Sequence, residues 1–445
     1  MMMQLATEET THASAFRRQL ETQRGESAWV RSLREQAFER FEHLGFPTVD
    51  DEDWKYTNVA AIAKTSFALV RANFKTVLTR DEVAPHVFDE AKQSCLVFVD
   101  GILNHELSSF AGLPAPPIDL MEGRRNDNDE QALGKLLAVD PNHNGFIALN
   151  TALFSNATCL RIPAGTKIEA PILLLFVSGG TGAGTPLASF PRLLIVAEQG
   201  SEATLIESYV SVGGESYLND AVMEIVVEDN ARLQHFRIQR ESTEAFHVAF
   251  TRAQLGKNAN YDTTAINLGA ALSRHDIDVA MDAEGAECSV DGLYMVDGRQ
   301  HTDTHSVIDH RQPRCTSHQL YKGILDGKSR AVFNGKVFVR HGAQQTDARQ
   351  TNKNLLLSNE ARVDTKPQLE IFADDVKCAH GAAIGRLDED EVFYLESRGI
   401  NPTLARNILT YGFAEEVIEK IKIDSLKRQL DESVLHRLHS QLAIE

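Results

Sequence analysis

Apolar and polar residues change their spacing twice along the chain and divide it into three parts. In the first part, apolar residues recur three or four positions apart, at Val30, Leu33, Phe38 and Phe41. This spacing puts them on one face and predicts an amphipathic helix from about residue 27. Gly45 and Pro47 follow in the order typical of a helix C-terminus.

The same part contains one strand signal and one loop signal. Cys95–Val99 is continuously apolar, and the Asp100-Gly101 pair after it favours a hairpin turn. Residues 111–145 are rich in Pro, Asp, Asn and Gly, which predicts a loop or insertion. We assign residues 1–154 to an N-terminal helical domain with a small β element.

From about residue 155 the pattern becomes that of short strands. Apolar or alternating runs are each broken by Gly, Asn or Asp, and they include Pro171–Val177, Leu193–Ala197, Val222–Val227 and Lys336–Arg340. Helical spacing is absent for about 230 residues, so we assign residues 155–385 to a β domain.

A weak repeat runs through this β region. A turn residue followed by alanine recurs at Ala203, Ala231, Ala259 and Ala286, with less regular echoes at Ala331 and Ala361. Repeats of nearly constant length with β content favour a solenoid, in which each coil buries its inner face against its neighbours. A β-sandwich or jelly roll with chance turn spacing is the alternative.

Residues 386–445 return to helical spacing and form the third part. Asp388 is placed to cap a short helix, and Asn401-Pro402 predicts the start of a second one. Leu404 and Ile408 lead into Phe413, Val417 and Ile421 along roughly one face. A last amphipathic helix is predicted from about residue 425 to 442. These helices either cap the solenoid or present a docking surface.

Composition and charge exclude several classes of partner. The 445 residues include 45 basic and 63 acidic ones, for a formal charge of −18. Such a surface repels phosphate backbones and anionic lipids, so nucleic acid and membrane are not expected partners. No apolar run approaches the ~20 residues that cross a bilayer. Glu8 and Glu9 argue against a transit peptide, so a cytoplasmic location is expected.

The cysteines give no framework for disulfides or zinc. All five are widely separated and form no CxxC pair. The stretch from Gly323 to Ser329 resembles a phosphate-binding loop. It has three residues between its first glycine and its Gly-Lys pair, where a P-loop has four. A strand pattern follows it instead of a helix. We read it as a turn.

Two histidine-containing motifs are candidates for chemistry. In His301-Thr302-Asp303-Thr304-His305, residues 301, 303 and 305 would share one face of a strand. His-x-Asp with a further His is the ligand pattern of mononuclear non-haem iron oxygenases, whereas the alternative is a structural polar face.

The second motif is Cys378-Ala379-His380, whose alternation puts thiol and imidazole on one side of a strand. These groups suit iron and sulfide, and the basic neighbour Lys377 would favour the thiolate. The alternative is a buried structural pair.

Several longer motifs together carry a family resemblance. They are Gln319–Leu325, Phe333–Lys336, Gln350–Ser358, Thr365–Ile371 and Asp374–Ala382, with Asp53–Thr57 and Phe393–Ile400 outside the dense region. They resemble the SufB/SufD family of the SUF iron–sulfur cluster assembly system. His380-Gly381-Ala382-Ala383 stands where the SufB branch carries a His-Glu-Ala-Thr-Thr-Ser-like stretch, so the SufD branch is favoured.

The resemblance implies a mainly β protein. Its core would be a right-handed parallel β-helix between helical end domains, in complex with a SufB-like paralogue and a SufC-like ATPase. The C-terminal helices would bind the ATPase, with Phe413, Val417 and Ile421 as candidates, and the end of the β-helix would pair with the paralogue. A homodimer of the isolated chain is left open.

The family's functional histidine maps to His380 and the neighbouring cysteine to Cys378. The sulfur-accepting cysteine is ascribed to SufB, so Cys378 could be a bystander. We therefore expect a non-catalytic scaffold with no firmly bound cofactor, and a transient iron–sulfur cluster or iron at the subunit interface. Alternatives of other classes are an iron oxygenase using His301 and Asp303, and a carbohydrate-active β-solenoid enzyme.

Overall fold

The computed structural model describes residues 17, 28–70, 78–119, 144–179, 186–214 and 216–440. The N-terminal elements are α2 (Ala28–Leu44), η1 (Glu52–Trp54), α3 (Ala60–Lys64), β1 (Ala68–Leu69), α4 (Arg80–Val83), η2 (Ala84–His86), η3 (Asp89–Ala91), β2 (Cys95–Val99), β3 (Ile102–Leu103), β4 (Ile118–Asp119) and α6 (Gly145–Leu153). The predicted helix and its C-terminus are confirmed: Gly45 has a φ of 67° and donates its N–H to Phe41 O at 2.7 Å.

The predicted hairpin at Asp100-Gly101 is also confirmed, because β2 and β3 pair antiparallel across it. Most of the predicted loop at 111–145 lies outside the described residues, and α6, which begins at Gly145, has no counterpart in the prediction.

The central strands follow one another without an intervening helix in the described ranges. They are β5 (Ala157–Ile162), β6 (Ile172–Ser178), β7 (Leu187–Ser189), β8 (Arg192–Ala197), β9 (Glu202–Ser211), β10 (Tyr217–Val227), β11 (Arg232–Arg240), β12 (Phe246–Leu255), β13 (Asn260–Asn267), β14 (Leu272–Met281), β15 (Glu287–Val296), β16 (His301–His310), β17 (Thr316–Leu325), β18 (Arg330–Val339), β19 (Thr346–Leu356), β20 (Arg362–Ile371) and β21 (Val376–Gly385).

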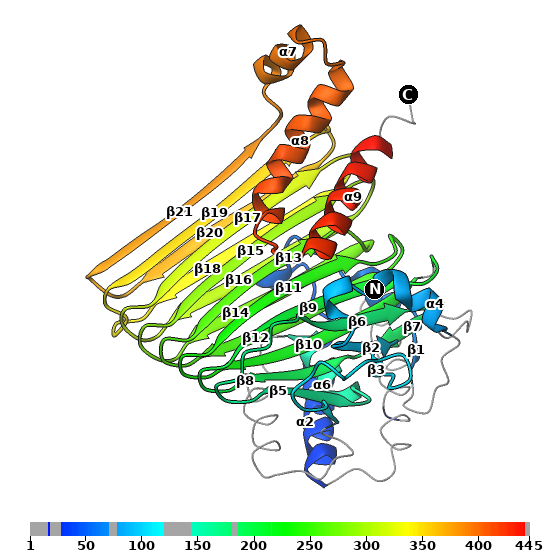
Figure 1. Cartoon of the computed structure of the whole chain (residues 1–445), viewed down its shortest axis with the longest axis vertical. Coiled ribbons are helices and arrows are strands. Elements are labelled where there is room, and N and C mark those ends of the chain that lie inside the picture. Colours follow the sequence, from blue (N-terminus) through cyan, green and yellow to red (C-terminus); the bar gives the residue numbers. More distant parts are fainter. Residues whose placement is uncertain are drawn as a thin grey trace.

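These strands form a parallel β-solenoid, which confirms the predicted fold class. From β8 onwards, even-numbered strands lie side by side in one sheet and odd-numbered strands in the other, so the chain alternates between the two sheets. Each pairs in parallel with the strand two places along, as β12 does with β14 and β13 with β15. Parallel pairing rules out the antiparallel sandwich. Figure 1 shows the coils stacked from the N-terminal elements towards β20 and β21.

One corner of the coil explains the sequence repeat. The chain turns there through a residue with positive φ, successively Gly200, Asn230, Asn258, Gly285, Arg314 and Gln345. Each of these residues donates its N–H to a carbonyl of the next coil, for example Asn258 to Glu284 O at 3.0 Å. A small buried residue follows directly: Ser201, Ala231, Ala259, Ala286, Cys315 and Thr346.

The sequence repeat predicts that the alanines occupy equivalent positions in successive coils. This prediction is wrong for Ala203 and for the later echoes, Ala331 and Ala361. Ala203 pairs with Leu233, and the true counterpart of Ala231 is Ser201, which lengthens that interval by two residues. Ala331 and Ala361 lie at β18 and before β20 in the other sheet. The predicted turn at Gly323–Ser329 is confirmed, because Gly327 has a φ of 59° between β17 and β18.

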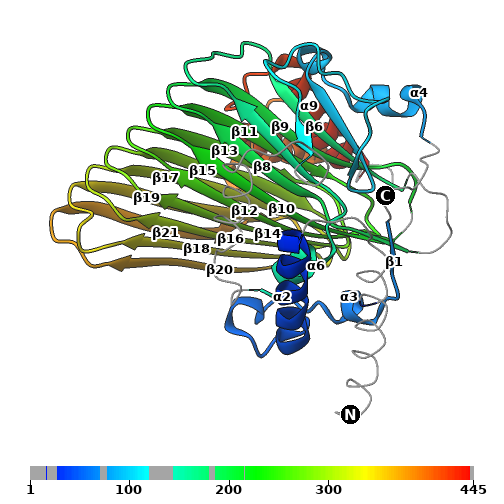
Figure 2. The same ribbon diagram turned by 90° about the horizontal axis from the view of Figure 1, so that it is seen from below.

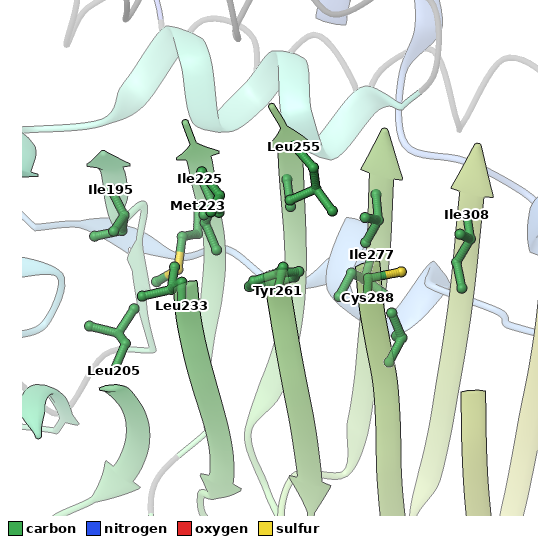
Figure 3. Close-up of a cluster of buried hydrophobic side chains, with 14 of the residues drawn as sticks. Ile195, Leu205, Met223, Ile225, Leu233, Leu255, Tyr261, Ile277, Cys288 and Ile308 are labelled. Carbon is green, nitrogen blue, oxygen red and sulfur yellow. The ribbon is translucent and has the colours of Figure 1, made fainter. Parts of the chain in front are cut away.

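Three hydrophobic clusters hold the fold together. One fills the lumen between the sheets, with Ile195, Leu233, Tyr261 and Ile308 among its members (Figure 3). A second lies between α2, α6 and the outer face of the even-numbered sheet, and Figure 2 shows both helices on that side. The third joins the outer face of the odd-numbered sheet to the C-terminal helices.

The C-terminal helices are α7 (Glu389–Ser397), α8 (Pro402–Ile418) and α9 (Asp424–Ser440). Both predicted caps are confirmed: the Asp388 side chain accepts from Asp390 N at 2.9 Å and that of Asn401 from Leu404 N at 2.9 Å. The single apolar face predicted for α8 is wrong. Val417 is buried on the solenoid, whereas Leu404 and Ile408 are each 42% exposed. Leu404 precedes Phe413, and Ile408 precedes Val417, by about two and a half helical turns, so each pair lies on opposite faces of α8.

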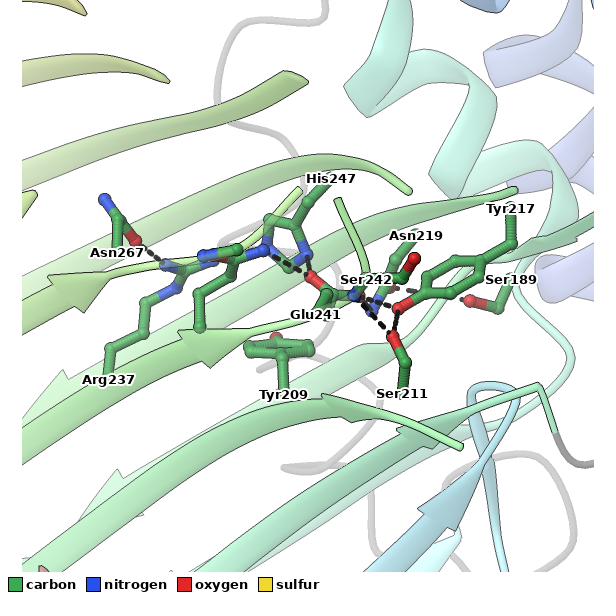
Figure 4. A network of polar contacts seen from close by, with 12 residues as sticks. Ser189, Tyr209, Ser211, Tyr217, Asn219, Arg237, Glu241, Ser242, His247 and Asn267 are labelled. Carbon is green, nitrogen blue, oxygen red and sulfur yellow. Dashed lines mark hydrogen bonds and ion pairs between the residues drawn. The ribbon is translucent and has the colours of Figure 1, made fainter. Parts of the chain in front are cut away.

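The lumen also contains a buried charged network (Figure 4). His247 Nδ1 lies 2.6 Å from Glu241, and Tyr217 donates to the same carboxylate at 3.0 Å. Arg237 contacts His247 and donates to Asn267 at 3.1 Å. Burial raises the pKa of Glu241, but His247 and the donors around it outweigh burial and leave the pKa lowered. The charged groups of this network are paired with one another. The network lies in the early coils, away from β21. Within the described ranges no helix is long and apolar enough to span a membrane.

Candidate functional site

The solenoid has an open end at β20 and β21. These are the last strands of their sheets, each ten residues long, and each has a hydrogen-bonded neighbour on one side only. β21 is largely exposed and β20 is mostly half-buried. Ile371 at the end of β20, Phe372 directly after it and Ile384 of β21 are 40%, 46% and 50% exposed. A long unpaired parallel edge with apolar side chains is unusual in a monomer because it can pair with another chain.

Cys378 and His380 both lie on β21 at this open end. Their neighbours in register on β19 are Ala348 and Gln350, which are buried in the lumen. Cys378 and His380 thus occupy lumen-facing positions of the last coil, about 7 Å apart along the strand. The prediction that they share one side is confirmed by this register. Cys378 is half-buried and packs against the lumen cluster, and His380 is exposed.

The predicted activation of Cys378 by Lys377 is wrong. Burial raises the pKa of the Cys378 thiol, and Asp347 adds to the rise against an opposing hydrogen bond from Ala348 N–H. Lys377 alternates to the outer face and does not contribute. The other four cysteines are buried, so Cys378 is the most accessible of five unbridged thiols.

Buried amides line the lumen directly below this coil, and sequence reasoning missed their role. Gln319, Gln350, Asn352 and Asn354 are each at most 4% exposed. Asn354 donates to Asn352 at 2.6 Å, and Tyr294 and Thr365 donate to this pair at 2.5 and 2.8 Å. The alternation Gln350-x-Asn352-x-Asn354 was the available signal, since polar residues at lumen positions must find partners there.

His301, Asp303 and His305 are brought together on β16, but they face the N-terminal domain. Thr57 donates to Asp303 Oδ2 at 2.5 Å, and His301 Nε2 lies 2.8 Å from the same hydroxyl. Because that hydroxyl has one proton, His301 Nε2 is the donor in the second bond. Arg274 donates to Asp303 Oδ2 at 2.8 Å.

The electrostatics of Asp303 are those of a structural ion pair. Burial opposes its ionisation, but His305 and Arg274, with hydrogen bonds from His305 and Thr57, hold its pKa well below the usual range. The Arg274 guanidinium lies 3.7 Å above the Trp54 ring and donates to Asp53 O at 2.7 Å. This clamp joins the Asp53–Thr57 motif to the solenoid.

The geometry therefore does not favour the oxygenase alternative. Both oxygens of Asp303 are engaged, Oδ1 by His305 at 3.1 Å and Oδ2 by Arg274 and Thr57. Among the described residues, no group of three or more His, Cys, Asp or Glu side chains is arranged to hold a metal ion.

Phe413, Val417 and Ile421, the candidate docking residues, lie where α8 meets the solenoid. Val417 and Ile421 are at most 1% exposed, and Phe413 is partly buried beside them. Lys322 of β17 donates to Phe413 O at 2.9 Å and lies 4.3 Å above its ring. The apolar surface that stays exposed on α7 and α8 consists of Phe393, Tyr394, Leu404 and Ile408.

A parallel β-solenoid with helical ends and an unpaired terminal coil defines the class of protein, and comparison with known sequences defines the family. The family model described as "SUF system FeS cluster assembly, SufBD core domain" matches residues 178–413, and "SufBD protein N-terminal region" matches residues 7–174. The chain belongs to the SufB/SufD family of the SUF system and acts in iron–sulfur cluster assembly.

Relatives cover nearly the whole chain. A SufBD family protein of Synechocystis is 38% identical, covering 88% of this chain and 87% of its own length. The iron–sulfur cluster assembly protein SufD of Escherichia coli is 34% identical, with 91% and 92% covered. SufD of Bacillus subtilis is 27% identical, with 91% and 93% covered.

Proposed function

We propose that this chain is a non-catalytic scaffold subunit that pairs, through the open end of its solenoid, with a SufB-like paralogue. The exposed edges of β20 and β21 are the observation that carries this proposal. Joining each edge to a matching strand would satisfy its free backbone groups and bury Ile371 and Ile384. A related solenoid offers strands of the same twist and spacing.

The second proposed partner is a SufC-like ATPase that docks on the C-terminal helices. Leu404 and Ile408 form an exposed apolar patch one turn apart on α8, on the side turned away from Phe413 and Val417. Val417 and Ile421 would support this surface from below, because they fix α8 on the solenoid. ATP-driven movement of the helices would then reach the open end through the solenoid.

The cluster or iron atom handled at the interface is cargo. His380 would ligate iron or hydrogen-bond sulfide there, with Cys378 in a lesser role since burial raises the pKa of its thiol and disfavours the thiolate. The remaining ligands would come from the paralogue, because the described part of this chain supplies no complete set.

Affinity purification from the native cell tests this function. A tagged wild-type copy should retain the SufB-like paralogue and the SufC-like ATPase, and deletion of the gene should lower iron–sulfur enzyme activities. Deletion of residues 388–445 should release the ATPase. Purification of the wild-type chain alone, with iron–sulfur enzymes unaffected by gene deletion, would contradict the proposal.

A further inference from the structure

A directional ladder of side-chain amides runs up the lumen towards His380. Gln319 on β17 and Gln350 on β19 are register partners, and His380 on β21 is the register partner of Gln350. Gln319 Nε2 donates to Ser306 Oγ at 2.8 Å, and Gln350 Nε2 donates to Gln319 Oε1 at 2.7 Å. Each amide of this ladder donates its hydrogen bond in the direction away from the open end.

The ladder stops at an acceptor without a donor. Gln350 is 2% exposed, and its Oε1 has no hydrogen-bond partner in the described structure. A buried carbonyl that has lost its water and gained no donor destabilises the fold, so a partner is expected for it. The next rung in register is His380, on a strand about 4.8 Å away, and an imidazole N–H is a donor of the required kind.

The opposite wall of the lumen is shaped around the same ladder. Gly335 on β18 faces the two amides, and a Cβ atom there would lie 2.3 Å from Gln350 Nε2 and 3.0 Å from Gln319 Oε1. Any other residue would push the amides out of line. This contact gives the Asn334-Gly335-Lys336 motif a physical reason and shows that the amide pair has space reserved for it.

We propose that Gln350 is a positioning residue for His380: its Oε1 accepts one ring N–H of the imidazole and fixes a single neutral tautomer. The other ring nitrogen is then unprotonated and points out of the open end. A histidine that binds a metal ion commonly donates its second N–H to a carbonyl in this way, which orients the ring. The functional consequence of this contact rests on the proposed role of His380, whereas the test of the contact itself does not.

The test is nuclear magnetic resonance of the full chain labelled with ¹⁵N and ¹³C in histidine, with His380→Ala assigning the signal. In the wild type, one ring nitrogen of His380 should be protonated and the other bare at neutral pH. Gln350→Met removes the acceptor and should give averaged shifts of two exchanging tautomers. Gln350→Glu keeps an acceptor at this position and adds a charge, so it should restore one tautomer.

Controls separate positioning from folding. Gln368→Glu adds the same charge at an outward position of β20, and the exposed His318 on β17 reports on non-specific effects; neither substitution at Gln350 should move the His318 signal. If Gln350→Met does not fold, Gln350→Asn can replace it, because its side chain is one methylene shorter and moves the acceptor away from His380. Identical His380 ring-nitrogen shifts in the wild type, Gln350→Met and Gln350→Asn would overturn the inference. Normal growth of a His380→Ala strain would instead overturn the proposed role of His380 and leave the contact standing.

Discussion

Thr57 donates a 2.5 Å hydrogen bond to Asp303, 246 residues further along the chain. Both side chains are at most 1% exposed, and Arg274 shares the carboxylate oxygen that Thr57 binds. The motif at Asp53–Thr57 and the polar motif on β16 are thus two halves of one buried contact. It fixes the N-terminal domain on the outer face of the even-numbered sheet.

Asp303→Asn should destabilise the protein, because it leaves the buried Arg274 and the partly buried His305 beside a neutral amide. Removing one member of a buried ion pair costs about 3–5 kcal/mol, and we expect the low end because Asp276 still pairs with Arg274 at 2.9 Å. Urea unfolding measures the loss. The exposed Asp374→Asn is the control and should change stability by at most about 0.5 kcal/mol. Equal stabilities of the two variants would refute the clamp.

The same carboxylate should make stability depend on pH. Its pKa is lowered in the folded state, so its contribution is full above the unfolded value near ~4 and is lost as the pH falls towards the folded value. Wild-type stability should therefore drop more steeply below about pH 4 than that of Asp303→Asn. Unfolding curves at several acidic pH values give this comparison, and parallel slopes for both proteins would count against it.

Ile384→Asp should abolish pairing with the SufB-like paralogue without unfolding the chain. Ile384 is 50% exposed at the open end, so a carboxylate there remains solvated in the isolated subunit but would be buried at an interface. Co-elution and thermal melting are the measurements. Val49→Asp, at a site 46% exposed in the N-terminal domain, is the matched control. Retained co-elution of the Ile384 variant would argue for another pairing surface.

Ile408→Asp should weaken binding of the ATPase without destabilising the protein, whereas Val417→Asp should destabilise it. Ile408 is 42% exposed, so its substitution should leave the melting temperature unchanged and reduce co-elution of the SufC-like ATPase. Val417 is fully buried, and an aspartate there should cost about 3 kcal/mol or more. Unchanged ATPase binding by a folded Ile408 variant would show that the ATPase docks on another surface.

His380→Ala should leave folding and assembly intact but abolish complementation in a cell that depends on this pathway. The exposed imidazole carries no packing that its loss would disturb, whereas alanine can neither ligate iron nor bind sulfide. Cys378→Ala should be milder because burial raises the pKa of its thiol and disfavours the reactive thiolate. Growth rate, iron–sulfur enzyme activities and melting temperature together decide the matter; wild-type growth of the His380 variant is the result that would exclude the site.

The sequence by itself determined the order of the elements and their local ends. Strand punctuation, the caps at Asp388 and Asn401 and the positive-φ positions at Asn230 and Asn258 are local properties, because they depend on neighbouring backbone geometry. The motif at Cys378 and His380 was likewise visible, since strand alternation alone places both on one side.

Only the tertiary structure decided which coil lies on which. The equivalence of Ser201 with Ala231 depends on inter-strand register, which the spacing of similar residues does not fix when coil lengths vary. The ladder from Gln319 through Gln350 to His380 and the contact of Thr57 with Asp303 join residues distant in sequence.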